Sequence, residues 1–140
     1  MLSHSGDWVT VFNGEIYNYP ELKQLLLKDG VPFFGDSDTE VLVNALDHWG
    51  VEATLNQCVG MFAFAAWHQP SATLYLARDR FGEKPLYYGH QNGVFAFASE
   101  LKSLSLLSDI GWNFSIDRRV LATYMRFGYV PSPYSIYQDI

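Results

Sequence analysis

The spacing of hydrophobic and polar residues changes along the chain and divides it into expected elements. Residues 8–13 (WVTVFN) are typical of a strand. Two amphipathic helices are expected next, one beginning after Asn18 and one beginning after Ser37 and ending at Gly50. Asn18 with Glu21, and Ser37 with Glu40, have the spacing of a capping box, so both pairs are predicted to close helix N-termini. A shorter helix is expected over about 51–57.

The middle of the chain consists of apolar runs of strand length, separated by turn signals. Strands are expected over 60–68, 72–79, 85–90 and 93–100. Their short connections make them antiparallel. No polar residue interrupts 61–67, so this strand is predicted to be buried on both faces. Such burial indicates sheet packed on sheet with helices outside, an α+β fold.

The last part of the chain returns to helical spacing. Helices are expected over 100–107 and 117–127, and the second has one apolar face. That face consists of Val120, Leu121, Tyr124 and Met125. Residues 128–140 are rich in Pro, Ser and Tyr and are typical of a linker.

Composition narrows the class of protein. The 140 residues are 49% hydrophobic, which predicts one folded domain. A net charge of −6 argues against nucleic acid as a partner. No apolar run approaches the ~20 residues that span a bilayer, and no secretion signal is present. Cys58 is the only cysteine, so a cytoplasmic chain without disulfides is expected, and Cys58 is predicted to be a buried structural thiol.

Asn13-Gly14 is the first candidate for chemistry. Helix signals follow it, which argues against a hairpin turn. A side-chain amide and an unobstructed backbone N–H could together stabilise an oxyanion. These residues alone favour a simpler interpretation, a loop glycine with positive φ beside an Asn that bonds the backbone.

Asp38 is the second candidate. A carboxylate in the first turn of a helix is stabilised by the helix dipole, which alone could explain it. Asp36 and Glu40 are close in sequence, so an acidic corner that binds an amine is the alternative. The charged stretch 77–88 (ARDRFGEKPLYY) offers no clear nucleophile, and the four His lack metal-ligand spacing, so no metal site is predicted.

Six blocks in order resemble one family, the glutaminase domain of glutamine-hydrolysing asparagine synthetases. These are class II glutamine amidotransferases with the N-terminal nucleophile hydrolase fold. The blocks are VFNGEIYNYPELK (11–23), DSDTEV (36–41), GMFAFAAW (60–67), ARDRFGEKPLYY (77–88), FAFASELKSL (95–104) and GYVPSPYSIYQDI (128–140). The resemblance implies a partial four-layer αββα sandwich with antiparallel sheets. It further implies an incomplete glutaminase domain over 1–116, with a helix and linker over 117–140 that lead toward an ATP-dependent synthetase domain.

The resemblance also assigns roles to individual residues. The Asn13 side chain and the Gly14 N–H would form the oxyanion hole, and Glu15 and Asp38 would hold the α-amino group of L-glutamine. The charged turn Arg78–Pro85 would belong to the scaffold around the pocket. Enzymes of this family release ammonia from glutamine and use it to amidate aspartate. ATP and Mg would act in the synthetase domain, and no cofactor is expected in this one.

The chain departs from the family at its start. Residue 1 is Met and residue 2 is Leu, whereas the family nucleophile is an N-terminal cysteine. The strand that carries it and an Arg for the glutamine carboxylate are missing as well, and Cys58 is not a substitute. An interior piece that is inactive alone is therefore expected, with an unpaired sheet edge that favours a homo-oligomer. A non-catalytic glutamine-binding or interaction module, and an amidotransferase with another acceptor, remain alternatives.

Overall fold

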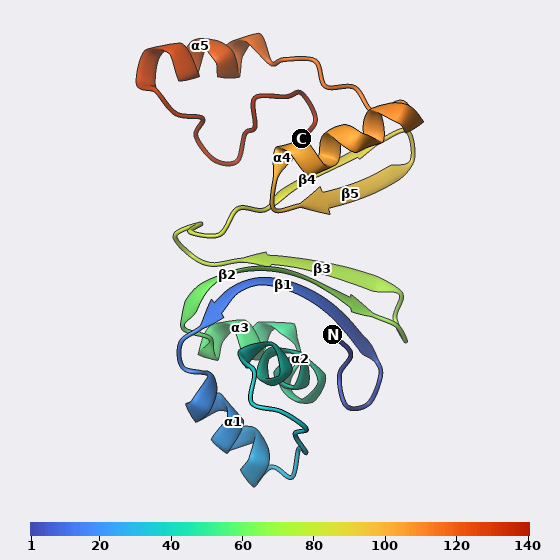
Figure 1. Ribbon diagram of the computed structural model, residues 1–140, viewed down its shortest axis with the longest axis vertical. Coiled ribbons are helices and arrows are strands. Elements are labelled where there is room, and N and C mark those ends of the chain that lie inside the picture. The colour runs from blue at the N-terminus through green and yellow to red at the C-terminus, as the bar shows by residue number, and fades with distance from the viewer. The chain divides into compact units, whose positions relative to one another are not determined.

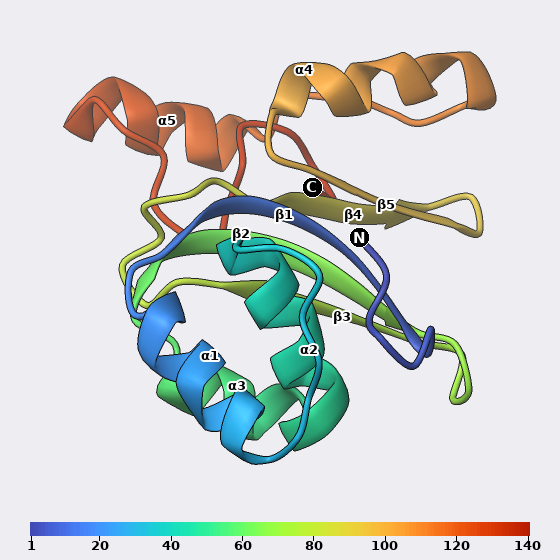
Figure 2. The same cartoon turned by 60° about the horizontal axis from the view of Figure 1, so that its bottom comes forward.

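The computed structural model describes residues 1–140, which form two compact units, Met1–Lys84 and Pro85–Ile140. The first unit contains an antiparallel sheet in the order β1-β2-β3, with its helices over one face (Figure 1 and Figure 2). Its elements are β1 (Trp8–Ile16), α1 (Tyr19–Lys28), α2 (Asp38–Trp49), α3 (Val51–Gln57), β2 (Gly60–His68) and β3 (Thr73–Arg78). The predicted mixture of helices and antiparallel strands is confirmed.

Strand β1 is longer than predicted, because it continues through Asn13-Gly14 to Ile16. Gly14 pairs with Phe62 of β2 and has a φ of 149°. A Cβ at Gly14 would lie 2.1 Å from the carbonyl oxygen of Met61. Glycine thus lets the two backbones approach and the pairing continue. The predicted end of the strand at residue 13 is wrong, and Gly14 lies in a strand rather than a loop, although its φ is positive as that interpretation expected.

The core of the first unit lies between the sheet and its helices. Trp8, Thr10 and Ile16 of β1 are buried, and the pleat places them on the same face. Phe62–Ala66 are all buried, as predicted for the central strand, but the prediction fails at its two ends, because Met61 is half-buried and Trp67 is 38% exposed. The core cluster comprises Trp8, Ile16, Leu22, Leu26, Val41, Leu42, Val43, Ala45, Leu46, Cys58, Phe62, Phe64 and Ala66.

The two predicted capping boxes have different outcomes. Ser37 does cap α2, since its Oγ accepts a hydrogen bond from the Glu40 N–H at 3.2 Å. Asn18 does not cap α1. Its amide donates to the Gln57 carbonyl and its Oδ1 accepts from the Val59 N–H, both at 2.9 Å. Asn18 therefore joins the start of α1 to the connection between α3 and β2.

The second unit begins with a hairpin and continues in helices. Its elements are β4 (Tyr87–Gln91), β5 (Val94–Ala98), α4 (Leu101–Leu104), the 3-10 helix η1 (Ser105–Ile110) and α5 (Arg118–Phe127). Trp112 is 4% exposed, and its ring lies against Gly89, where a Cβ would come within 3.1 Å of it. Residues 128–140 contain no helix or strand. They return alongside residues 115–117 through a bridge between Ile116 and Tyr137.

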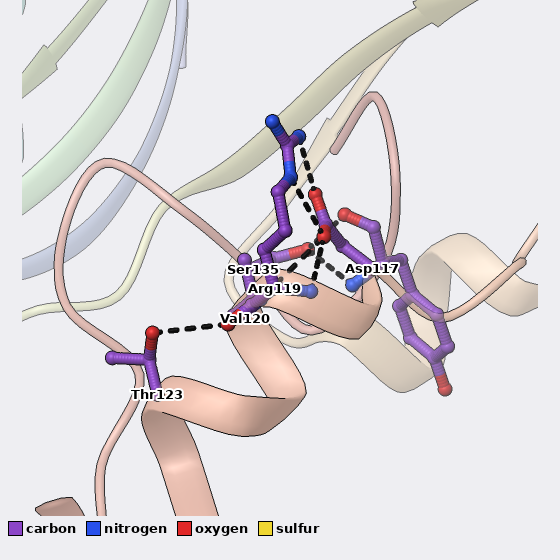
Figure 3. A network of polar contacts seen from close by, with 6 residues as sticks. Asp117, Arg119, Val120, Thr123 and Ser135 are labelled. Atoms are coloured by element: carbon purple, nitrogen blue, oxygen red, sulfur yellow. Dashed lines mark hydrogen bonds and ion pairs between the residues drawn. The ribbon is translucent and has the colours of Figure 1, made fainter. Parts of the chain in front are cut away.

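Helix α5 is fixed at its N-terminus by Asp117, as Figure 3 shows. The Asp117 carboxylate accepts from the Arg119 N–H at 2.8 Å and from the Arg119 guanidinium at 3.0 and 3.3 Å. The predicted apolar face is only partly buried. Val120 is 7% exposed, whereas Tyr124 is 46% and Met125 is 77% exposed.

Candidate functional site

The outer edge of β1 forms one side of the candidate site. Backbone groups of successive residues in a strand point to opposite edges. The Tyr17 N–H donates to the Val59 carbonyl at 2.7 Å, so odd-numbered residues pair with β2. The Thr10 N–H donates to the Met1 carbonyl at 2.8 Å, so even-numbered residues face the outer edge. This alternation directs the Gly14 N–H away from β2, to the outer edge.

Asp38 reaches the same edge from the first turn of α2. Its Oδ2 accepts a hydrogen bond from the Ile16 N–H at 3.1 Å, and its Oδ1 accepts from the Thr39 hydroxyl at 3.3 Å. Ile16 follows Gly14 by two residues, which separates their N–H groups by about 7 Å along the strand. The Asp38 carboxylate and the outward Gly14 N–H therefore lie about 7 Å apart on the same edge of β1.

Asn13 and Glu15 complete the corner from the sheet face. Both are odd-numbered, so the pleat places them on the face opposite the helices. Asn13 is half-buried, whereas Glu15 is exposed and its side-chain carboxylate makes no hydrogen bond or ion pair within the chain. The fold brings all four predicted site residues to one end of β1.

The loop before Asp38 is held from two sides. The Lys23 ammonium donates to the Gly35 carbonyl at 2.7 Å and to Asp36 Oδ1 at 2.6 Å. The Glu40 carboxylate accepts from the N–H groups of Phe34 and Gly35 at 2.7 and 2.8 Å. The hydrogen bond from Lys23 also lowers the pKa of Asp36.

These contacts correct the predicted acidic corner. Asp36 is paired with Lys23, and Glu40 is engaged by backbone donors. Only Asp38 extends to β1. A cation arriving at this corner therefore meets Asp38 and the exposed Glu15 rather than a cluster of three acids.

The charged stretch after β3 is organised by Asp79, which sequence reasoning passed over. Asp79 is 7% exposed, and its carboxylate accepts from four N–H groups at 3.0–3.2 Å. The donors are Phe62, Phe81, Glu83 and Lys84. Burial alone would raise the pKa of Asp79, but these donors outweigh it and the pKa is lowered.

Arg78 supports the same loop, since its guanidinium donates to the carbonyls of Gly82 and Lys84. Both charged residues therefore bond backbone groups of residues 79–84. An Asp directly after a strand, with a glycine soon afterwards, is a signal for such a turn. The contacts show that the turn is internally bonded, and its predicted place around a glutamine pocket stays a prediction.

Cys58 is an inert thiol in this fold. It is 2% exposed, and burial raises its pKa to about 11. A pocket of about 240 Å³ lies beside it, with Val59, Phe62 and Arg80 in its lining. At neutral pH hardly any thiolate forms, so Cys58 does not act as a nucleophile. The prediction of a buried structural cysteine is confirmed.

Two other kinds of site are absent. No three His, Cys, Asp or Glu side chains lie together in a way that could hold a metal ion. None of the helices has the length and apolar character that crossing a bilayer requires.

The fold and the corner at β1 define a class of protein. A solved structure, the glutamine phosphoribosylpyrophosphate amidotransferase from Bacillus subtilis, matches 77% of this chain with a TM-score of 0.65 and 26% identity. The match covers 25% of that chain. The predicted N-terminal nucleophile hydrolase fold of a glutamine amidotransferase is thereby confirmed.

The family follows from the sequence match. The model of the glutamine amidotransferase domain matches residues 1–140, and the chain belongs to this family. It is 47% identical over 126 residues to glutamine-hydrolyzing asparagine synthetase 1 of Bacillus subtilis, covering 90% of this chain. It is 37% identical over 131 residues to asparagine synthetase 3 of the same organism. The chain spans only 19% and 20% of these two relatives.

Proposed function

We propose that the corner at the end of β1 binds L-glutamine and that the chain is the glutaminase portion of an ATP-dependent asparagine synthetase. The observation that supports this most strongly is the common edge of β1, which carries the Gly14 N–H and the Asp38 carboxylate. The names of the similar proteins, glutamine-hydrolyzing asparagine synthetases, supply the substrate and the product.

Two charge interactions would orient the substrate. The α-amino group of glutamine is a cation, and it would lie between Asp38 and Glu15. Asp38 is already held by the Ile16 N–H at 3.1 Å, so little side-chain entropy is lost when the amine binds. The exposed Glu15 contributes a second negative charge.

The amide end of glutamine would point toward Asn13 and Gly14. During hydrolysis its carbonyl oxygen gains negative charge when a nucleophile attacks the carbon. An Asn amide and a backbone N–H on the outer edge would donate to that oxygen and stabilise the tetrahedral intermediate. Both residues are held in β1 by its pairing with β2.

The 140 residues alone would not complete the reaction. Their only thiol, Cys58, is buried and stays protonated at neutral pH. We expect glutamine binding by this chain without ammonia release. In a whole synthetase the ammonia would amidate aspartate, with ATP and Mg bound by a synthetase portion. A cytoplasmic location, a synthetase partner domain and a homo-oligomer belong to the same proposal.

Glutamine titration followed by amide NMR tests the site. The ligands are L-glutamine and its analogue without the α-amino group, 5-amino-5-oxopentanoate. In Asp38→Asn the remaining side-chain oxygen can still accept from the Ile16 N–H, so only the charge is lost. A charged hydrogen bond contributes about 1.5–3 kcal/mol, so glutamine binding should weaken roughly 10- to 150-fold. Binding of the analogue should hardly change.

Glu52→Gln is the matched control, since Glu52 is also an acid in the first turn of a helix. It should leave both affinities unchanged. An equal loss of glutamine affinity in both variants would mean that only the net charge of the chain affects binding, and not the position of the carboxylate. Unchanged glutamine binding in Asp38→Asn would rule out the assigned role.

The alternatives can be separated from this proposal. A non-catalytic glutamine-binding module would give the same titrations. The reading frame upstream of residue 1 distinguishes the two, because a glutaminase of this family begins with Met-Cys. An amidotransferase with another acceptor would differ only in the synthetase portion. An acceptor screen on the full-length protein would show which carboxylate is amidated.

A further inference from the structure

Lys23, in the middle of α1, is shielded from solvent to a degree that is uncommon for a lysine. Its side chain is 18% exposed, whereas most lysine side chains lie in solvent. The ammonium donates to the Gly35 carbonyl at 2.7 Å and to Asp36 Oδ1 at 2.6 Å. It also lies 5.0 Å from the centre of the Phe33 ring. All three contacts are with the loop between α1 and α2, so Lys23 attaches this loop to α1.

The same loop is attached to α2 from its other side. The Glu40 carboxylate accepts from the N–H groups of Phe34 and Gly35 at 2.7 and 2.8 Å. The Ser37 hydroxyl accepts from the Glu40 N–H and caps the helix. Lys23 and Glu40 therefore fix the loop between the two helices.

These contacts close a ring that passes through the candidate site. Helix α1 begins soon after β1 ends, and Lys23 joins α1 to the loop. The loop leads directly into α2, whose first residue is Asp38. Asp38 then returns to β1, where its Oδ2 accepts from the Ile16 N–H at 3.1 Å. One hydrogen bond joins this carboxylate to the strand, so its position also depends on where the loop holds the start of α2.

We propose that Lys23 is a positioning residue for the bound amino acid. Its ammonium is engaged by the loop and not by the ligand. Through the loop it holds the start of α2, so that Asp38 stays at the edge of β1 where the α-amino group binds. A carboxylate that is fixed before binding loses less conformational entropy when the amine arrives. This inference deepens the proposed function and rests on glutamine binding at this corner.

The ion pair with Asp36 explains how a cation can act beside a cation-binding site. An unpaired ammonium would repel the α-amino group of the ligand. The Asp36 carboxylate lies 2.6 Å from the Lys23 ammonium and balances its charge. The hydrogen bond from Lys23 lowers the pKa of Asp36, so Asp36 stays ionised at neutral pH. Lys23 thus supplies hydrogen bonds to the loop with little net charge toward the site.

Removal of Lys23 has two effects of opposite sign on the binding of an amine. In Lys23→Met the loss of the positive charge leaves Asp36 unpaired, which by itself would strengthen the binding of a cation. The loss of the contacts with the loop would weaken it. We expect the affinity for L-glutamine to fall roughly 2- to 12-fold, the cost of ordering one freed side chain. The sign of the change therefore separates positioning from a simple effect of charge.

Amide NMR titration of this chain with L-glutamine and with 5-amino-5-oxopentanoate measures the change. The analogue lacks the α-amino group, so its affinity should be the same in wild type and in Lys23→Met. Lys23→Arg keeps a cationic donor and should keep most of the glutamine affinity. Lys28→Met is the matched control, because it removes an exposed positive charge from the last turn of the same helix. It should not weaken glutamine binding.

Three results of these titrations would overturn the proposal. The first is glutamine binding that is unchanged or tighter in Lys23→Met. The second is an equal loss for glutamine and the analogue, which would indicate a general disturbance of the site. The third is an equal loss in Lys23→Arg and Lys23→Met. If Lys23→Met does not fold, Lys23→Gln takes its place in every comparison, since its amide is a donor without charge.

Amide exchange at Ile16 tests the positioning without a ligand. In Lys23→Met the Asp38 carboxylate should leave the strand edge more often, so the Ile16 N–H should exchange faster. The Tyr17 N–H bonds to the Val59 carbonyl instead and should keep its rate. Unchanged exchange at Ile16 would contradict the inference. Faster exchange there, in a chain whose wild type does not bind glutamine, would refute the proposed function and leave the positioning of Asp38 intact.

Discussion

The loop that follows β3 depends on one buried carboxylate, and Asp79→Asn should show how strongly. Asn has one acceptor oxygen in place of two, so two of the four N–H donors lose their partner and face an NH₂ group. The Phe62 N–H is buried, and a buried donor without an acceptor costs about 1–3 kcal/mol. The remaining two hydrogen bonds also lose their charge. We expect the free energy of unfolding to fall by about 3–5 kcal/mol.

Urea unfolding followed by tryptophan fluorescence measures this loss. Glu83→Gln removes one negative charge from the same loop at an exposed side chain, and it should cost less than ~0.5 kcal/mol. The slope of the free energy against urea should be the same in all three proteins. A loss under about 1 kcal/mol for Asp79→Asn would contradict the assigned role.

The pH dependence is a second check on the same residue. The folded pKa of Asp79 is lowered, whereas an unfolded Asp titrates near about 3.9. The carboxylate therefore stabilises the fold fully above pH ~4, and this contribution disappears as pH falls through the folded pKa. The difference between wild type and Asp79→Asn should be constant from pH 6 to 8 and should shrink in acid. A difference that does not change with pH would show that the negative charge is not the cause.

Three other expectations concern the first unit. Gly14→Ala should lower the free energy of unfolding by more than about 2 kcal/mol in thermal melts, because its Cβ meets the β2 backbone. Gly6→Ala, with positive φ but open space, should cost about 1 kcal/mol. Asn18→Ala should cost about 1–3 kcal/mol in urea, at least as much as removal of the true cap in Ser37→Ala. At pH 7.5 Cys58 should react with iodoacetamide about two orders of magnitude more slowly than an exposed thiol. The reaction rate should rise as the pH approaches the Cys58 pKa of about 11, and unfolding in urea should remove the difference from an exposed thiol.

Local sequence patterns predicted the structural features that depend only on residues close together in the chain. The Ser37 cap, the stop at Gly50 and the burial of residues 62–66 rest on helix-end chemistry or on an unbroken apolar run. They were visible without knowledge of any distant contact.

The features that could not be predicted from the sequence depend on contacts between residues far apart in the chain. Asn18 has the spacing of a cap, but its amide bonds to residues 39 and 41 positions away. Asn13-Gly14 has the sequence of a turn, but it lies within a strand because it pairs with residues of β2 that are nearly fifty positions further along the chain. The four residues of the candidate site were found through resemblance to a family, since their own spacing favoured simpler explanations.

The contacts of Gly14 and Asp38 affect what their presence can tell a comparative biologist. Gly14 would be retained by selection for folding alone, because a side chain there collides with β2. Asp38 would be retained for its bond to the Ile16 backbone. The Glu15 side chain makes no such contact within the chain, so substitutions at this position would not be selected against once glutamine binding is no longer needed. Among descendants of this chain, Glu15 is therefore the position whose loss would mark the end of glutamine use.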